Sequence, residues 1–281
     1  MKEQKKKLSP RKVFWKCGAC SHAMFHLLNI EFGNVAPDEE KASDVLAGGI
    51  ALKGHQCGML WGAALGAGVE ANRKFDDKDK AVAVSMKSSM RLVESFKKRA
   101  KYLDCRDITK VDWNNKFHFA IHMIKTILRG FIFSHCFNLF AKWGHEAIET
   151  AKQGINEDVD CESKCLSCST ELLKKMGATE EESVFVSGFA GGIGLSGNAC
   201  GALGAAVWYK MLVWIRKNPE ETPSMFKNEE SAKIFEVFNK QTDSEMLCRN
   251  ICGKTFNSIE EHSDFVKNGG CQELLEVLSG V

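Results

Sequence analysis

The sequence has no strong excess of charge of either sign and no long hydrophobic run. Its formal net charge is +2 and its pI is about 7.9, so composition gives no argument for nucleic acid or for a strongly charged partner. The most apolar stretch, 199–215, contains Lys210 and is shorter than the ~20 residues that cross a bilayer. We therefore expect no membrane span and no nucleic-acid partner.

The N-terminal residues are basic but lack the apolar core of a secretory signal. We expect residues 1–16 to form a solvated tail and the protein to be cytoplasmic. Because cytosolic thiols stay reduced, the 12 cysteines indicate metal binding or redox chemistry rather than a disulfide scaffold.

The sequence also lacks runs of alternating apolar and polar residues, which are typical of strands. Residues 79–101 instead repeat apolar side chains at helical spacing, and 179–182 read Thr-Glu-Glu-Glu, a helix start. We therefore predict an all-α fold. The expected helices cover 17–30, a segment from 37, a segment from 57, 79–101, 115–129, 131–151, 165–176, a segment from 179, 198–216, 228–240, 246–252, 258–266 and 270–279.

The pattern A-G-G-I-x-L-x-G-x-x-C-G occurs twice, at 47–58 and at 190–201. A C-x-x-C pair precedes each copy, a Cys-Arg dipeptide follows each copy at the same distance, and a last cysteine follows later. The chain is therefore a tandem duplication of a unit of about 140 residues, a normal domain size. The matching cysteines are Cys17, Cys20, Cys57, Cys105 and Cys136 in the first half and Cys165, Cys168, Cys200, Cys248 and Cys271 in the second.

The duplication predicts a domain organisation in four segments. These are a basic tail at 1–16, a first repeat at 17–152, an acidic linker at 153–164 and a second repeat at 165–281. A chain of 281 residues with 44% apolar content can bury a sizeable core. We expect the chain to bury two cores.

The glycine-rich segment 192–197 matches the G-x-G-x-x-G motif of dinucleotide-binding folds. That motif needs a strand before it, whereas this segment follows a helix start, and the first copy has Ala51 where the second has Gly194. We interpret the glycines as a turn between helices that brings the backbone close to whatever Cys200 binds. Cys57 and Cys200 stand at predicted helix starts, where the helix dipole is expected to lower the pKa of a thiol.

Several kinds of site use cysteines in such numbers. A thioredoxin-like dithiol belongs beside a βαβ pattern, which the sequence lacks. His22 and His26 lie at helical spacing beside Cys17 and Cys20, as zinc ligands could, but the second half has no histidine at those positions, so we interpret both as ordinary histidines. Repeated all-cysteine sets fit iron–sulfur ligation, while soft thiolates also bind zinc and Cu(I).

The cysteine that opens a helix, the Gly-Gly-Ile stretch that leads to Cys-Gly, the later Cys-Arg-x-Ile and the final cysteine resemble the C-GCAxxG-C-C family of redox-active proteins, once in each half. A related domain occurs in split-Soret cytochromes, where an iron–sulfur centre accompanies haem; the haem-binding portion has no counterpart here. The resemblance implies an iron–sulfur cluster in each repeat, electron transfer or redox sensing, and a redox partner protein. The ligands that it implies are Cys20, Cys57, Cys105 and Cys136, then Cys168, Cys200, Cys248 and Cys271.

The chain departs from the family pattern in places. Met59 replaces the family's alanine, Ala205 replaces its last glycine, and Cys136 follows Cys105 at a longer spacing than Cys271 follows Cys248. We expect backbone N–H groups of the glycine segments to approach the cofactor, and three further thiols to be additional candidate ligands. The glycines are Gly48, Gly49, Gly58, Gly191, Gly192 and Gly201, and the further thiols are Cys17, Cys165 and Cys252.

Two other functions stay open at this point. One is a thiol–disulfide redox enzyme that uses the C-x-x-C dithiols, and the other is a zinc-stabilised binding module. Sulfur separations distinguish them: a disulfide has an S–S bond of about 2.05 Å, and a tetrahedral zinc site with Zn–S bonds of about 2.3 Å places sulfurs roughly 3.8 Å apart. A cluster spreads its ligands wider.

Overall fold

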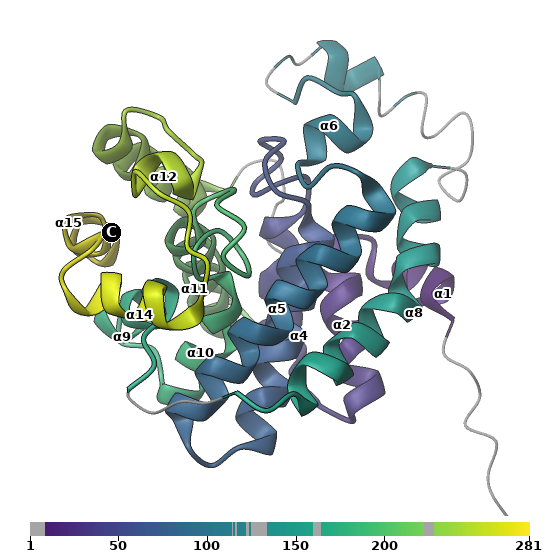
Figure 1. Cartoon of the computed structure of the whole chain (residues 1–281). Coiled ribbons are helices and arrows are strands. Elements are labelled where there is room, and N and C mark those ends of the chain that lie inside the picture. The colour runs from purple at the N-terminus through teal and green to yellow at the C-terminus, as the bar shows by residue number, and fades with distance from the viewer. Residues whose placement is uncertain are drawn as a thin grey trace, which may run out of the picture.

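The computed structural model describes residues 9–113, 115, 117–121, 124, 134–159, 164–221 and 228–281. Within these residues it consists of helices and turns with two isolated β-bridges and no sheet, which confirms the all-α prediction (Figure 1). The helices are α1 (Pro10–Cys17), α2 (Cys20–Phe32), α3 (Pro37–Ala42), η1 (Ser43–Leu46), α4 (Gly58–Lys74), α5 (Lys78–Ala100), α6 (Cys105–Thr109), α8 (His135–Asn156), α9 (Cys168–Lys175), α10 (Glu180–Phe185), η3 (Ser187–Phe189), α11 (Gly201–Lys217), α12 (Glu229–Thr242), α13 (Cys248–Ile251), α14 (Ile259–Lys267) and α15 (Gln272–Ser279).

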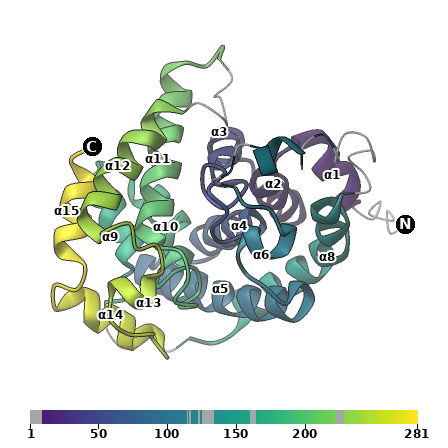
Figure 2. The same ribbon diagram turned by 90° about the horizontal axis from the view of Figure 1, so that it is seen from above.

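The two repeats place equivalent helices in the same order. A helix that opens with the second cysteine of C-x-x-C (α2 or α9) leads through two short helices and the glycine-rich turn to a long helix (α4 or α11). Seen from above, helices α9 to α15 gather on one side and helices α1 to α8 on the other (Figure 2). No described helix is long and apolar enough to cross a membrane.

Two helix starts show how local sequence sets these elements. The Asp77 side chain accepts hydrogen bonds from the backbone N–H groups of Asp79 and Lys80 at the start of α5. Thr179 and Glu182 form a reciprocal capping box at the start of α10. Both satisfy N–H groups that have no partner within the helix, and both were predictable from the residue types.

The N-terminal segment differs from the predicted solvated tail. Residues 10–17 form α1, in which Val13 and Phe14 are buried, and Phe14 stacks on Phe140 of α8 at 4.9 Å between ring centroids. Cys17 therefore ends α1 and does not open the next helix. The prediction failed because the burial of this apolar pair outweighs the basic charge around it; residues 1–8 lie outside the described part.

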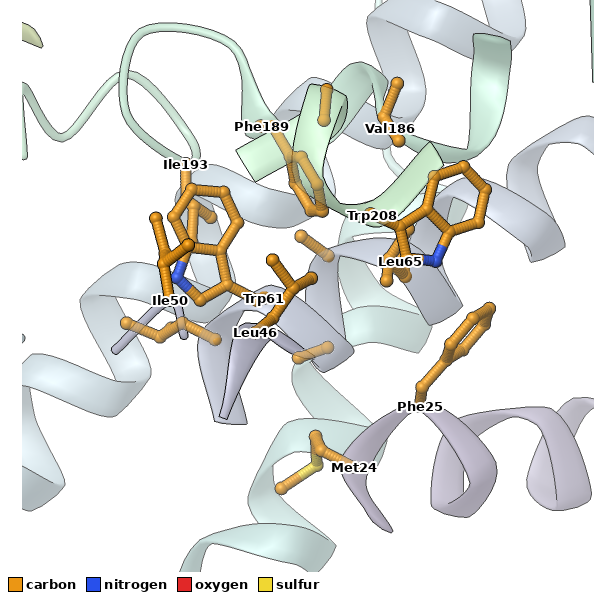
Figure 3. Close-up of a cluster of buried hydrophobic side chains, with 14 of the residues drawn as sticks. Met24, Phe25, Leu46, Ile50, Trp61, Leu65, Val186, Phe189, Ile193 and Trp208 are labelled. Carbon is orange, nitrogen blue, oxygen red and sulfur yellow. The ribbon is translucent and has the colours of Figure 1, made fainter. Parts of the chain in front are cut away.

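The described residues form two buried clusters, the expected number, but neither cluster is confined to one repeat. The largest buried cluster draws residues from both repeats, because helices of one repeat pack on helices of the other: α4 contacts α10, and α11 contacts α3 and η1. Trp61 of α4 packs over Gly204 of α11, where a methyl group would lie 2.4 Å from the indole ring. Trp61 also meets Phe189 edge to face at 4.7 Å, and Figure 3 shows Ile193 among the same side chains.

Two other predicted segments differ at their ends. Helix α8 continues to Asn156, into the range 153–164 that we predicted as a linker. The predicted helices 115–129 and 131–151 fall partly outside the described residues; within them, 117–121 is helical and α8 begins at His135.

Candidate functional site

In the first repeat, an isolated β-bridge brings two distant cysteines together. The bridge pairs Gln56 with Asp104. On either side of it the Cys57 N–H donates to the Leu103 carbonyl at 2.8 Å, and the Cys105 N–H donates to the His55 carbonyl at 2.7 Å. Backbone hydrogen bonds therefore hold the two cysteines next to each other, independently of their side chains.

The second repeat contains the same device. Ala199 pairs with Leu247, and the Cys200 N–H donates to the Met246 carbonyl at 2.9 Å. The arginine after the second cysteine fastens the bridge in both repeats: the Arg106 Nε donates to the Gly54 carbonyl at 3.1 Å, and Arg249 hydrogen-bonds to Asn198. This explains why Cys-Arg recurs at the same spacing.

The glycine-rich turn before each bridge winds through the left-handed region over five consecutive residues. That conformation costs about 1–2 kcal/mol for each non-glycine residue, and such strain concentrates at functional sites. The left-handed residues are Gly48, Gly49, Ile50, Ala51 and Leu52 in the first repeat and Gly191, Gly192, Ile193, Gly194 and Leu195 in the second.

The turn delivers backbone N–H groups to a third cysteine in each repeat. The Gly48 N–H hydrogen-bonds to Cys20, at the start of α2, and the Gly191 N–H hydrogen-bonds to Cys168, at the start of α9. Gly58 leaves room for the first of these thiols, because a methyl group there would lie 2.7 Å from Cys20 Sγ. The glycine backbone thus approaches a cysteine sulfur in both repeats, while its approach to a cofactor stays a prediction.

Four cysteines meet in the first repeat. Burial raises the pKa of Cys57 well above its ordinary value, and so do the charges of Cys20 and Cys136. Burial, followed by the charges of Cys57, Cys136 and Cys20, raises the pKa of Cys105, and burial raises that of Cys136 to about 12. Cys136 lies in the first turn of α8, so the longer spacing that precedes it does not remove it from the group.

Five cysteines and a histidine line one nearly closed pocket in the second repeat. Two measured separations join three of the thiols: Cys248 Sγ lies 3.8 Å from Cys252 Sγ, which lies 3.5 Å from Cys271 Sγ. The residues that contribute donors to this pocket are Cys168, Cys200, Cys248, Cys252, Cys271 and His262. The free volume between them is about 10 Å³, which is room for about one water molecule.

Charge distinguishes Cys168 from the other thiols of this pocket. Burial favours its neutral form, but the charge and hydrogen bond of His262, followed by the Gly191 N–H and the Ser169 hydroxyl, lower its pKa below the ordinary value. Burial raises the pKa of Cys200 instead, although N–H groups at the start of α11 oppose the shift. The expected fall in the pKa of Cys57 and Cys200 is therefore wrong, since burial outweighs the helix dipole.

Cys17 has a different environment from the four clustered thiols of its repeat. It hydrogen-bonds to His22, whose Nδ1 lies 3.1 Å from Asp44 Oδ1. Burial lowers the pKa of His22, but Asp44 and Cys17 outweigh it and raise the pKa to about 10. Cys165, its counterpart by sequence, is buried beside Cys248 in a second hydrophobic cluster.

None of the eleven cysteines in the described residues forms a disulfide. Nor does that part of the chain hold three or more His, Cys, Asp or Glu side chains already spaced as the ligands of a bound ion. The donors of each group are nevertheless thiols close enough to shift one another's pKa, and soft metals prefer thiolates. The residues therefore fit a metal centre in the type of donor atom. A centre of more than one atom would require the side chains of the thiols in the second repeat to rotate away from one another.

The family model described as "Putative redox-active protein (C_GCAxxG_C_C)" matches the chain twice, over residues 19–143 and 161–279. The chain belongs to this family. Its two C-GCAxxG-C-C repeats are the halves that the duplicated pattern predicted. Searches of curated proteins and of solved structures gave no match.

Sequence reasoning missed one residue of the second C-GCAxxG-C-C repeat. His262 lies in α14 and lines the pocket, but no histidine occupies a matching place in the repeated pattern, so comparison of the halves gave no signal for it. Cys252 was only an additional candidate because its counterpart in the first repeat is Thr109. It follows Cys248 by one helical turn, a spacing that places both on one helix face.

Proposed function

We propose that the protein is an electron-transfer or redox-sensing protein in which each repeat binds one iron–sulfur centre through its clustered cysteines. When bound, such a centre would gain and lose single electrons. The observation that carries the proposal is the repeated convergence of four thiols from distant segments. Membership of a redox-active family supports the redox part of the proposal.

The chain would tune the centre in two ways. The backbone N–H groups of Gly48 and Gly191 donate hydrogen bonds to Cys20 and Cys168, respectively. When a thiolate that ligates a metal accepts such a hydrogen bond, the reduction potential of that metal shifts. Burial of the thiols keeps water away, since Cys57 and Cys200 are 4% and 6% exposed.

A groove gives the second site a route to a redox partner. It has a volume of about 820 Å³, and Cys252 and Cys271 line both this groove and the closed pocket. The carboxylates of Asp243, Glu245 and Glu273 also line it. A partner with a basic surface around its own redox group would fit this rim, and such an association weakens as salt screens the charges.

A single-metal zinc site is the second candidate, and the sulfur separations favour it. The values of 3.5 and 3.8 Å are too long for a disulfide and match the roughly 3.8 Å between two thiolates on one tetrahedral zinc ion. They also fit two ligands of one iron atom, because tetrahedral thiolate geometry is common to zinc and iron–sulfur sites.

Metal analysis after oxygen-free purification decides between these candidates. We expect iron together with acid-labile sulfide, and a visible absorption that bleaches on reduction. Zinc without sulfide in protein expressed with sufficient iron would contradict the iron–sulfur proposal and support the zinc module. Protein without metal that cycles between thiol and disulfide states would instead support a dithiol enzyme.

A further inference from the structure

Two buried side-chain polar atoms among the described residues of the second repeat have no hydrogen-bond partner, Ser231 Oγ and His262 Nδ1, and His262 lines the cysteine pocket. His262 is 2% exposed, and its Nδ1 accepts and donates no hydrogen bond. A buried polar atom left unsatisfied is destabilising, and the ring that carries this one lines the cysteine pocket, which indicates a missing ligand. Imidazole nitrogen is a common ligand of zinc and iron.

Packing against a neighbouring aromatic ring sets the position of the imidazole. Phe256 meets His262 edge to face at 4.9 Å. Helix α14 is also tied to the chain before Cys168, because the Ser263 hydroxyl accepts from the Leu166 N–H at 2.9 Å. These contacts hold the imidazole at the pocket, where its charge acts on the Cys168 thiol.

Cys252 is the other donor that the first repeat lacks. Its sulfur stands between those of Cys248 and Cys271, at 3.8 and 3.5 Å. The equivalent Thr109 uses its hydroxyl locally, donating to the Cys105 carbonyl at 2.7 Å and accepting from Trp113 Nε1. The charged neighbours differ as well: carboxylates of Asp44 and Asp104 act on the first group of cysteines.

We propose that His262 and Cys252 belong to the donor set of the second repeat, so that the two repeats hold chemically different centres. This inference rests on the proposed cysteine centres and adds that the first is bound by thiolates alone, while the second includes an imidazole. Replacing thiolate by neutral imidazole removes negative charge and raises the reduction potential of an iron–sulfur centre. In a redox titration we therefore expect the second repeat to be reduced first.

Cobalt(II) is the probe for this proposal, because its visible absorption distinguishes four-sulfur sites from sites with three sulfurs and one nitrogen. The full-length chain, freed of metal and kept without oxygen, is titrated with cobalt(II) alone. We expect two distinguishable sites in the wild type. His262→Gln should convert the nitrogen-containing spectrum to an all-thiolate one and weaken that site at least about tenfold, whereas the control His26→Gln should change neither site.

The companion variant Cys252→Thr copies the residue found in the first repeat. We expect it to weaken the second site by about tenfold and to keep its nitrogen signature. Unchanged cobalt affinity in this variant would remove Cys252 from the donor set. Two identical four-thiolate sites in the wild type, unaffected by His262→Gln, would overturn the role of His262 and leave the proposed centres standing.

Two further results complete the test. If neither repeat binds cobalt, the proposed function fails and this inference fails with it. If His262→Gln does not fold, cadmium NMR of the wild-type chain with isotopically labelled histidine replaces the variant. One of two cadmium resonances should then be split by a histidine nitrogen, and two unsplit resonances would overturn the proposal.

Discussion

The two repeats have the same backbone structure at the β-bridge but place their last cysteine differently. Cys57 and Cys200 occupy the same place beside the same β-bridge and cap equivalent helices. The last cysteine, however, lies in the first turn of α8 in one repeat and is the left-handed N-cap of α15 in the other. Duplication has preserved the backbone around the bridge, whereas the position of the last cysteine relative to its helix has diverged.

This difference separates two roles of the sequence pattern. The glycine-rich turn and the Cys-Arg bridge are determined by backbone geometry, which allows few residue types at each position. The donors added after the bridge need only reach the site, so different segments can supply them. If the backbone around the bridge and the set of donor side chains are independent, a substitution in one should leave the other intact.

Removing the bridge cysteine should abolish one centre and leave the other. We expect Cys200→Ser to lose the centre of the second repeat and Cys57→Ser that of the first, each with about half of the iron and sulfide remaining, because the ligating thiolates hold the cluster. Iron and sulfide analysis of oxygen-free protein measures both. Cys17→Ser is the matched control, since Cys17 pairs with His22 outside the group of four, and full iron content in Cys200→Ser would contradict the assignment.

Adding a methyl group after the bridge cysteine should affect the two repeats unequally. A methyl at Gly201 would lie 1.9 Å from the Phe189 carbonyl oxygen, a backbone atom, whereas at Gly58 the nearest atom is Cys20 Sγ at 2.7 Å. We expect Gly201→Ala to lower the free energy of unfolding by about 3 kcal/mol, and Gly58→Ala by about 1 kcal/mol because a side chain can move.

Urea unfolding of the two alanine variants checks this difference. Gly58→Ala should displace the Cys20 thiol and so lower the metal content of the first repeat more than its stability. Equal losses of stability in the two variants would show that the turns are less alike or more adaptable than the structure indicates.

Most of the correct predictions about the fold and the site came from short stretches of sequence. The capping box at Thr179 and the apolar periodicity of α5 act within one helix, and the duplicated pattern placed the matching cysteines without any knowledge of packing. The pKa of Cys57 could not be predicted, because burial depends on contacts made by other elements. Likewise nothing in residues 10–17 alone shows that Phe14 stacks on α8, more than a hundred positions away.

The left-handed turn is the part that a sequence pattern describes least well. Glycine at Gly48 and Gly49 suggests a turn, but Ile50 and Leu52 have no residue preference for positive φ, and both adopt it. Tertiary packing outweighs their local preference: Ile50 is fully buried beside Trp61 and Ile193 (Figure 3). Within the described residues no strand precedes the G-x-G-x-x-G motif, which follows the short helix η3 instead.

The smallest effect concerns the one turn position at which the repeats differ in glycine. Gly194 approaches α5 so closely that a methyl would lie 2.5 Å from the Met90 nitrogen, whereas its counterpart Ala51 is partly exposed with φ of 47°. Gly194→Ala should therefore destabilise the protein by about 2 kcal/mol. Ala51→Gly should stabilise it by about 0.5 kcal/mol, because relief of a left-handed alanine slightly exceeds the entropy cost of glycine in the unfolded chain. The denaturant midpoint should fall in Gly194→Ala and rise in Ala51→Gly. A lower midpoint for Ala51→Gly would mean that the partly exposed turn of the first repeat is not strained.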